Sequence, residues 1–188
     1  MSNEKEPIFS IGHGSRTNGD FLKLLKDFGI EYLIDVRSQP YSKFNPQFNQ
    51  SELKFFLEEN NIKYVFMGDQ LGGRPDKSKY RICYNENDTV DYETVRTQEF
   101  FVQGLERLKT AYEKNVKVVM MCSESKPCEC HRSKLIGREL NALNIPIKHI
   151  DEKGKLKDQQ TVILELNGGK NETDLFGIQE NMTSRKKY

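Results

Sequence analysis

The fold of this chain is decided by the stretch Val116-Lys117-Val118-Val119-Met120-Met121, which leads through Cys122–Arg132 into Ser133-Lys134-Leu135-Ile136-Gly137-Arg138-Glu139-Leu140. The first run is short and apolar, as expected of a buried strand, and the last run has the apolar spacing of a helix. The polar segment between them therefore joins the carboxyl end of a strand to the amino end of a helix. Its thiols, carboxylate, imidazole and guanidinium make it a candidate site.

The same alternation of strands and helices extends along most of the chain. Further strands are predicted at 8–11, 32–36, 62–66 and 145–150, and further helices at 21–28, 53–57 and 101–112. Such alternation favours a parallel sheet flanked by helices. We therefore predict an α/β fold with a mostly parallel sheet, in a single domain over 7–151 that is followed by a C-terminal extension over 152–188.

Three segments lack this regular pattern. Gly, Pro, Asn, Asp and Lys dominate between Gly68 and Thr94, and so long a loop inside a domain is typically functional or mobile. The run Thr161–Leu166 fits either a helix or an edge strand. The polar stretch 167–188 is expected to be a flexible tail.

Composition limits the class of protein. A length of 188 residues suits one domain, and a net charge of +1 excludes a strongly basic nucleic-acid-binding coat. No apolar run approaches the ~20 residues that span a bilayer, and the amino terminus lacks the pattern of a secretory signal. We therefore expect a cytoplasmic protein without membrane contact, whose four cysteines are free, catalytic or metal-binding rather than disulfide-bonded.

Polar residues gather where three predicted strands end. His13, Asp35-Val36-Arg37-Ser38 and the segment from Cys122 to Arg132 all follow strands. Ligands of α/β sheets bind at these carboxyl ends, so we expect the three segments to meet. Cations outnumber carboxylates in the gathered set, which favours an anionic ligand such as a phosphate or a carboxylate. The set comprises His13, Arg37, Lys43, Arg74, His131 and Arg132 against Asp35 and Glu124.

The cysteines allow several interpretations. Cys130 is predicted in the first turn of a helix beside His131 and Arg132, which would lower its pKa and make it a nucleophile, while a buried structural thiol is the alternative. The spacing excludes the cysteine phosphatase loop, because no arginine follows Cys122 or Cys130 at the required distance. A zinc site formed by Cys122, Cys128, Cys130 and one histidine has an unfamiliar spacing, so we predict no metal and no other cofactor.

The remaining candidates also have two interpretations each. Glu124 suits acid or base catalysis, or an ion pair with Arg37 or Arg132. His13 suits proton transfer or phosphate binding, or a turn satisfied by the backbone. Asp35 and Arg37 point to the same side of their strand, so they either line the pocket or form an ion pair that fixes the loop. Of these we predict that Arg37 binds the ligand with Asp35 as its support. Gly72, Gly73 and Arg74 predict either a lid over a phosphate or a surface turn.

Several short motifs occur in order along residues 8–150: Ile11-Gly12-His13-Gly14, Asp35-Val36-Arg37-Ser38-Gln39-Pro40, Phe44–Phe48, Leu71-Gly72-Gly73-Arg74, Met121-Cys122-Ser123-Glu124, Cys130-His131-Arg132 and His149-Ile150. In these motifs the chain resembles the domain-of-unknown-function 488 (DUF488) family. The resemblance implies a Rossmann-like α/β domain. The family has no established general activity, but its shared polar residues imply an enzyme or a nucleotide-related binding protein. The motif positions that it singles out are His13, Asp35, Arg37, Gly72, Gly73, Cys122, Glu124, Cys130, His131 and Arg132. Cys128 falls where the family pattern is open, which weakens the zinc alternative.

Together these features predict an enzyme that acts on a phosphate-bearing substrate such as a nucleotide or a nucleic acid, by hydrolysis or glycosidic-bond cleavage. Arg37, Arg132 and His13 would hold the anion, and Glu124 would act as acid or base. Cys122 or Cys130 would be either the nucleophile or part of the pocket wall. The alternatives are a non-catalytic module that binds a nucleotide, nucleic acid or protein, and a thiol-based redox or metal sensor. No oligomeric state is predicted.

Overall fold

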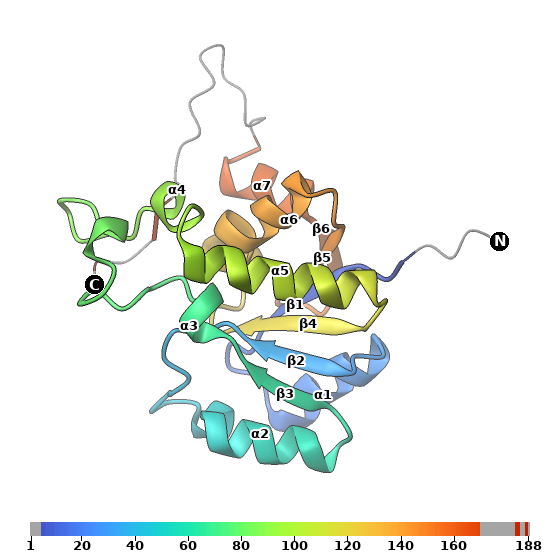
Figure 1. Cartoon of the computed structure of the whole chain (residues 1–188). Helices are drawn as coiled ribbons and strands as arrows, with labels where there is room; N and C mark the ends of the chain where they lie inside the picture. Colours follow the sequence, from blue (N-terminus) through green and yellow to red (C-terminus); the bar gives the residue numbers. More distant parts are fainter. Residues whose placement is uncertain (1–4, 170–182, 185–186, 188) are drawn as a thin grey trace.

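The computed structural model describes residues 5–169, 183–184 and 187 of the chain, and within them six strands form one sheet (Figure 1). The strands are β1 (Ile8–Gly12), β2 (Tyr32–Asp35), β3 (Lys63–Phe66), β4 (Val118–Cys122), β5 (Ile147–Ile150) and β6 (Leu156–Asp158). Their order across the sheet is β3-β2-β4-β1-β5-β6. All neighbouring strands are parallel except β5 and β6, which are antiparallel. The predicted α/β architecture with a mostly parallel sheet is confirmed, and it is consistent with a Rossmann-like arrangement.

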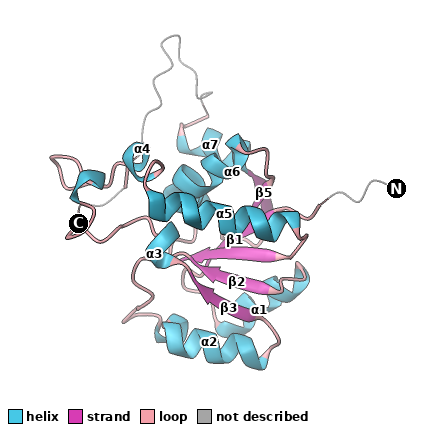
Figure 2. Cartoon of the chain, viewed as in Figure 1, coloured by secondary structure: helices cyan, strands magenta, loops and turns pink. Residues whose placement is uncertain are grey.

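Helices cover both faces of this sheet (Figures 1 and 2). One face carries α1 (Asn18–Asp27) and α2 (Gln50–Glu59), and the other carries α5 (Glu99–Glu113) and α6 (Arg138–Ala142). The remaining helical segments are α3 (Gly68–Leu71), α4 (Tyr92–Val95), α7 (Gln159–Leu166), the 3₁₀ turns η1 (Pro46–Phe48), η2 (Arg81–Cys83) and η3 (Pro127–Glu129), and the π-helix η4 (Arg132–Gly137). No helix among the described residues is long and apolar enough to cross a bilayer.

The two faces of β4 belong to two separate cores. Val118 and Met120 pack with the apolar cluster under α5, whereas Val119 and Met121 pack with the cluster under α1 and α2. Successive side chains of a strand point to opposite faces, so a strand buried on both faces needs an unbroken apolar run. The apolar stretch 118–121 therefore places β4 in the middle of the sheet and fixes the position of Cys122 at its carboxyl end.

Helix α1 shows how local sequence sets an element. The hydroxyl of Thr17 accepts a hydrogen bond from the backbone N–H of Asp20 and caps the helix, and Phe21 and Leu25 are buried one turn apart. Gly29 follows the helix with a φ of +64°, a conformation that glycine adopts without steric cost. The predicted helix and its predicted end at Gly29 are confirmed.

The segment 68–94 has more structure than the sequence predicted. It contains α3, η2 and the start of α4, and it buries Cys83, Tyr84, Val90 and Tyr92. The prediction of one continuous loop was therefore wrong for residues 68–71, 81–83 and 92–94, which form helical turns. Helical turns of three or four residues are too short to produce a periodic apolar pattern, so glycine, proline and asparagine dominated the sequence signal.

The C-terminal part also differs in detail. Residues 161–166 form part of helix α7, which Asp158 caps, and the short strand β6 before it was not predicted. Of the predicted tail, residues 170–182, 185–186 and 188 lie outside the described residues. Thr183 forms a bridge with Asp91, and the backbone N–H of Ser184 donates to Val90 O at 2.9 Å. The division into a domain over 7–151 and an extension over 152–188 stays a prediction.

Candidate functional site

A cavity of about 240 Å³ opens at the carboxyl ends of β2 and β4. Its walls come from segments far apart in the sequence: the end of β2, the turn after α3, the end of β4, and the junction between η3 and η4. The lining residues are Arg37, Ser38, Gln39, Gly73, Arg74, Tyr92, Cys122, Ser123, Glu124, Glu129, Cys130, His131 and Ser184. The sheet topology therefore brings two of the three predicted strand-end segments, those after β2 and β4, around one cavity.

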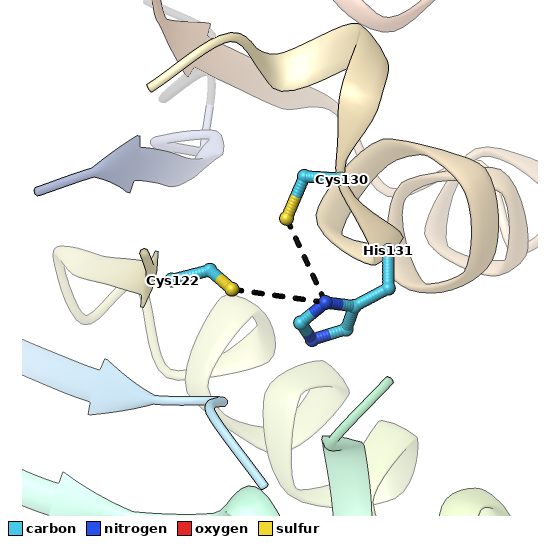
Figure 3. A group of neighbouring side chains, drawn as sticks. All are labelled: Cys122, Cys130 and His131. Carbon is cyan, nitrogen blue, oxygen red and sulfur yellow. Dashed lines mark hydrogen bonds between the residues drawn. The ribbon is translucent and has the colours of Figure 1, made fainter. Parts of the chain in front are cut away.

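Two thiols and an imidazole form a tight group on the cavity wall (Figure 3). His131 Nδ1 lies 3.8 Å from Cys122 Sγ and 3.6 Å from Cys130 Sγ. Cys122 ends β4, whereas Cys130 is an extended residue directly before the helical segment that begins at His131 and continues into η4. All three residues are buried, and we refer to them as the thiol–imidazole cluster.

The orientation of His131 follows from its second nitrogen. Nε2 lies 3.1 Å from the backbone oxygen of Val36, in the segment after β2. A carbonyl oxygen only accepts hydrogen bonds, so Nε2 carries the proton and, in the neutral ring, Nδ1 presents its lone pair to the two sulfurs.

The carboxylate of Glu124 lies beside the thiol–imidazole cluster. Its Oε2 atom lies 3.0 Å from Cys122 Sγ and 3.6 Å from Cys130 Sγ, and its side chain is part of the cavity wall. The sequence also allowed an ion pair between the Glu124 carboxylate and Arg132. In the described structure Nη2 of Arg132 donates instead to the backbone oxygen of Glu124, at 2.7 Å.

Arg132 supports the cluster from behind the wall. Its side chain is 0% exposed, and Nε donates to Cys130 Sγ at 3.1 Å. Gly12 at the end of β1 makes this arrangement possible, since a Cβ there would overlap the backbone oxygen of Glu124 and approach Nη2 of Arg132 to 3.0 Å. Arg132 therefore does not line the cavity itself but contacts two residues that do, Cys130 and Glu124.

The two thiols have opposite acidities. Burial alone would raise the pKa of Cys130, but the hydrogen bond with Cys122 and the charges of Arg132 and His131 hold that pKa well below its ordinary value. The hydrogen bond with Cys130, together with burial, raises the pKa of Cys122 well above its ordinary value. Of the two thiols, Cys130 is therefore the one whose surroundings favour the thiolate.

Asp35 and Arg37 form a buried pair beside the cavity. The Arg37 guanidinium donates to both carboxylate oxygens of Asp35, at 2.9 and 2.6 Å, and the Tyr64 hydroxyl donates to Oδ2 at 2.7 Å. Arg37 also lines the cavity, whereas Asp35 is fully buried behind it. Both sequence alternatives for this pair, an ion pair and a pocket-lining arginine, therefore occur together.

The turn 72–74 packs closely on the site. The backbone N–H of Arg74 donates to Ser38 Oγ at 3.0 Å, and Arg74 Nη2 donates to Gln39 Oε1 at 2.9 Å. A Cβ at Gly72 would approach the Cα of Ser38 to 3.1 Å, and a Cβ at Gly73 would lie 2.6 Å from Cγ of His131. The two glycines therefore allow close approach of the backbone, and Gly73 and Arg74 form part of the wall.

His13 lies apart from the cavity wall that the described residues form. Its ring stacks on Phe48 at 4.4 Å between centroids, and Nδ1 lies 2.8 Å from Gly14 O. Burial lowers its pKa to about 4, so the ring is neutral at pH 7. Nε2 is buried without a hydrogen-bond partner among the described residues.

The structure brings some of the predicted site residues to the cavity wall and places others away from it. Arg37, Gly73, Arg74, Cys122, Glu124, Cys130 and His131 meet at the cavity, whereas His13, Asp35, Gly72 and Arg132 lie outside the wall as the described residues form it. Cys128 is not a member of the thiol–imidazole cluster in the described structure. Tyr92 and Ser184 were missed because neither lies in a motif or at a strand end, while Ser38 lies within a motif that pointed to Arg37.

Comparison with known proteins gives one match. The family model described as "Domain of unknown function DUF488" matches residues 18–138. This range covers β2, β3, β4 and the whole thiol–imidazole cluster. No match was found among curated proteins or among solved structures.

Proposed function

The chain belongs to the DUF488 family, and we propose that it is an enzyme that cleaves a bond in a small anionic substrate bound at the carboxyl ends of β2 and β4. The observation that carries this proposal is the composition of a single cavity wall. Arg37 and Arg74 supply cations, and Glu124 and Glu129 supply carboxylates beside two thiols and an imidazole. Anion-binding groups and acid–base groups in one cavity are the combination that such an enzyme requires.

The two arginines are suited to hold the anion in different ways. Arg37 is oriented by two hydrogen bonds to Asp35, so its guanidinium is held in place before a ligand arrives. Arg74 follows two glycines and is only partly buried, so its side chain can adjust to the ligand. Phosphate is a good candidate for the anion, because arginine binds its oxygens in a bidentate manner.

The volume of the cavity limits the substrate. About 240 Å³ is slightly below the usual range of roughly 300–1,000 Å³ for small-molecule sites. A phosphosugar, a nucleotide or the end of a single nucleic-acid strand fits this description, and a duplex does not. We therefore place nucleotides and single-strand ends among the candidate substrates.

Glu124 is the proposed acid or base. Its carboxylate is partly buried on the wall, where it can take a proton from a water molecule or give one to a leaving group. Hydrolysis or glycosidic-bond cleavage by this route needs no covalent bond to Cys122 or Cys130. In this proposal Asp35 positions Arg37, and Arg132 positions Cys130 and the backbone of Glu124.

Ligand-induced stabilisation against heat tests the binding part of the proposal. The panel consists of nucleotides, phosphosugars and short single strands of DNA and RNA, applied to the wild type and to Arg74→Gln. Arg74→Gln is preferable to Arg37→Ala, which would leave the buried Asp35 carboxylate without its main partner. Lys43→Gln serves as the control, since Lys43 is exposed and not among the lining residues. We expect a stabilising ligand whose effect is reduced in Arg74→Gln and retained in Lys43→Gln.

Turnover of that ligand tests the catalytic part. Glu124→Gln keeps the shape of the side chain and removes its acid–base capacity, so we expect turnover to fall by about 10²–10⁴-fold while the stabilisation by ligand persists. Binding without turnover by the wild type would instead assign the chain to the non-catalytic binding modules.

A further inference from the structure

We propose that the thiol–imidazole cluster is a zinc site, with Cys122 Sγ, Cys130 Sγ and His131 Nδ1 as its three protein ligands. This inference goes beyond the proposed function and does not depend on it, since a metal site can be measured without a substrate. Thiolate and imidazole are the donors that zinc prefers, and the three donor atoms all lie within 4.8 Å of one another.

The two nitrogen–sulfur distances within the cluster match those of a tetrahedral site. With Zn–S of about 2.3 Å and Zn–N of about 2.0–2.1 Å, two ligand atoms at a tetrahedral angle lie roughly 3.6 Å apart. The distances from Nδ1 to the two sulfurs are 3.6 and 3.8 Å. An ion can therefore be placed between the three atoms with little movement of the backbone.

The ring of His131 is already oriented as a ligand. Its Nε2–H donates to the backbone oxygen of Val36 at 3.1 Å, so in the neutral ring, the form that binds a metal, the lone pair of Nδ1 points to the sulfurs. Metal-bound histidines almost always donate their other ring N–H to a carbonyl or a carboxylate, which fixes the tautomer. Figure 3 shows the ring directed between Cys122 and Cys130, although the first residue ends a strand and the second directly precedes a helical segment.

Arg132 stabilises negative charge on the sulfur of Cys130. Arg132 donates to Cys130 Sγ from its side-chain Nε at 3.1 Å and from its backbone nitrogen at 3.5 Å. The Arg132 side chain is fully buried, so its positive charge acts in a medium of low dielectric. Two thiolates and one zinc ion are neutral together, and this environment lowers the cost of burying them.

The fourth position of the proposed site faces the cavity. Cys122, Cys130 and His131 line the cavity together with Glu124, whose Oε2 lies 3.0 and 3.6 Å from the two sulfurs. Structural zinc sites are closed by four protein ligands, whereas catalytic sites retain one position for water or substrate. The geometry assigns this site to the second class, with the Glu124 carboxylate beside the open position.

Metal titration of the full chain tests the inference. Protein stripped with a chelator under reducing conditions is titrated with Zn²⁺ in competition with a chromophoric chelator, and separately with Co²⁺. We expect one Zn²⁺ per chain, and near-ultraviolet absorption from thiolate-to-cobalt charge transfer with visible bands of tetrahedral intensity. The cobalt spectrum is measured on the wild type, so it remains informative even where a variant fails to fold.

Variants identify the ligands. Cys122→Ser, Cys130→Ser and His131→Gln are each expected to weaken zinc binding by more than about 100-fold, since loss of an outer-shell partner alone costs roughly 10–100-fold. Cys128→Ser is the matched control, because Cys128 lies in the same connection but outside the cluster. The proposal is overturned by a reduced wild type that binds no Zn²⁺, by a Co²⁺ spectrum without thiolate bands, or by equal loss of zinc in Cys128→Ser. None of these outcomes changes the ligand-stabilisation test of the proposed function.

Discussion

Gly73 lies so close to the ring of His131 that no side chain fits between them. A Cβ at this position would lie 2.6 Å from Cγ and 2.8 Å from Nδ1 of His131. The ring cannot retreat without losing the hydrogen bond from Nε2 to Val36 O. The absence of a side chain at residue 73 is therefore a condition for the geometry of the thiol–imidazole cluster.

Gly73→Ala is consequently expected to displace His131. We predict a loss of about 1–3 kcal/mol in the free energy of unfolding, the usual cost of overpacking, together with weaker zinc binding. Urea denaturation and zinc titration measure the two effects. Gly19→Ala in α1 is the control, because its Cβ would meet only Thr17 Oγ1 at 3.9 Å and alanine favours a helix. Equal stability and zinc affinity in Gly73→Ala and wild type would show that His131 tolerates the contact.

The buried pair of Asp35 and Arg37 gives a second prediction at the residue scale. Asp35→Ala leaves the guanidinium of Arg37, which is 5% exposed, without its carboxylate, and the expected cost is about 3–5 kcal/mol. Tyr64→Phe removes a single hydrogen bond to the same carboxylate and should cost only about 1.5 kcal/mol. Chemical denaturation of both variants checks the order, which the reverse ranking would contradict.

Among the elements, the π-helix η4 joins the site to helix α7. All six residues of Arg132–Gly137 are buried. The amide of Gln159 in α7 donates from Nε2 to Ser133 O at 2.9 Å, and its Oε1 lies 2.7 Å from His149 Nε2. Gln159 therefore links α7, η4 and β5 through one side chain.

Gly137→Ala tests how tightly these elements fit. The added Cβ would overlap Gln159 Oε1 and lie 2.9 Å from Arg132 O, so we expect a loss of about 1–3 kcal/mol in the free energy of unfolding. A double-mutant cycle with Gln159→Ala measures the coupling, because the methyl group gains space once the amide is removed. Fully additive costs would mean that the clash with Gln159 does not occur.

The same elements show what the sequence can and cannot predict. The apolar run 118–121 identifies a central strand, and the segments after β2 and β4 meet because parallel strands end at one edge. The apolar spacing of 133–140 is equally compatible with α- and π-helical turns, so the π-helix could not be predicted. Tyr92 and Ser184 reach the cavity through contacts distant in sequence, which no local pattern reports. His13 follows β1 as predicted, but stacking on Phe48 holds its ring away from the cavity wall.

At the scale of the whole molecule, a buried chain of hydrogen bonds crosses from β1 through β5 to α7. Ser10 Oγ lies 2.6 Å from His149 Nδ1, and His149 Nε2 lies 2.7 Å from Gln159 Oε1. The oxygen of Gln159 accepts, so Nε2 is the donor and Nδ1 accepts the hydroxyl proton of Ser10. The protonated ring would have to donate from Nδ1 as well, so it would keep both contacts only with the Ser10 hydroxyl reversed into an acceptor, and its charge would lie in a fully buried site.

Acid should therefore destabilise the fold through His149. Burial lowers its pKa from 6.5 to about 4, so above pH 6.5 the ring is neutral in both the folded and the unfolded chain. Between pH 6.5 and 4 the unfolded chain binds a proton that the folded chain does not. Stability then falls by up to about 1.4 kcal/mol per pH unit, or roughly 3 kcal/mol in total, and the contribution is complete below pH 4.

Urea denaturation from pH 7.5 to 4 isolates this contribution when the wild type is compared with His149→Gln. Glutamine retains a donor and an acceptor but does not titrate. Between pH 6.5 and 4 the stability of the variant should therefore fall less steeply than that of the wild type, and the difference in slope should correspond to the binding of close to one proton. His13, whose pKa is also lowered to about 4, titrates in both proteins and cancels in the difference. The variant starts from a lower stability at pH 7.5, but only the difference in slopes reports the titration of His149. Identical slopes in the two proteins would mean that His149 becomes protonated within the fold and that the chain from Ser10 to Gln159 rearranges to accept it.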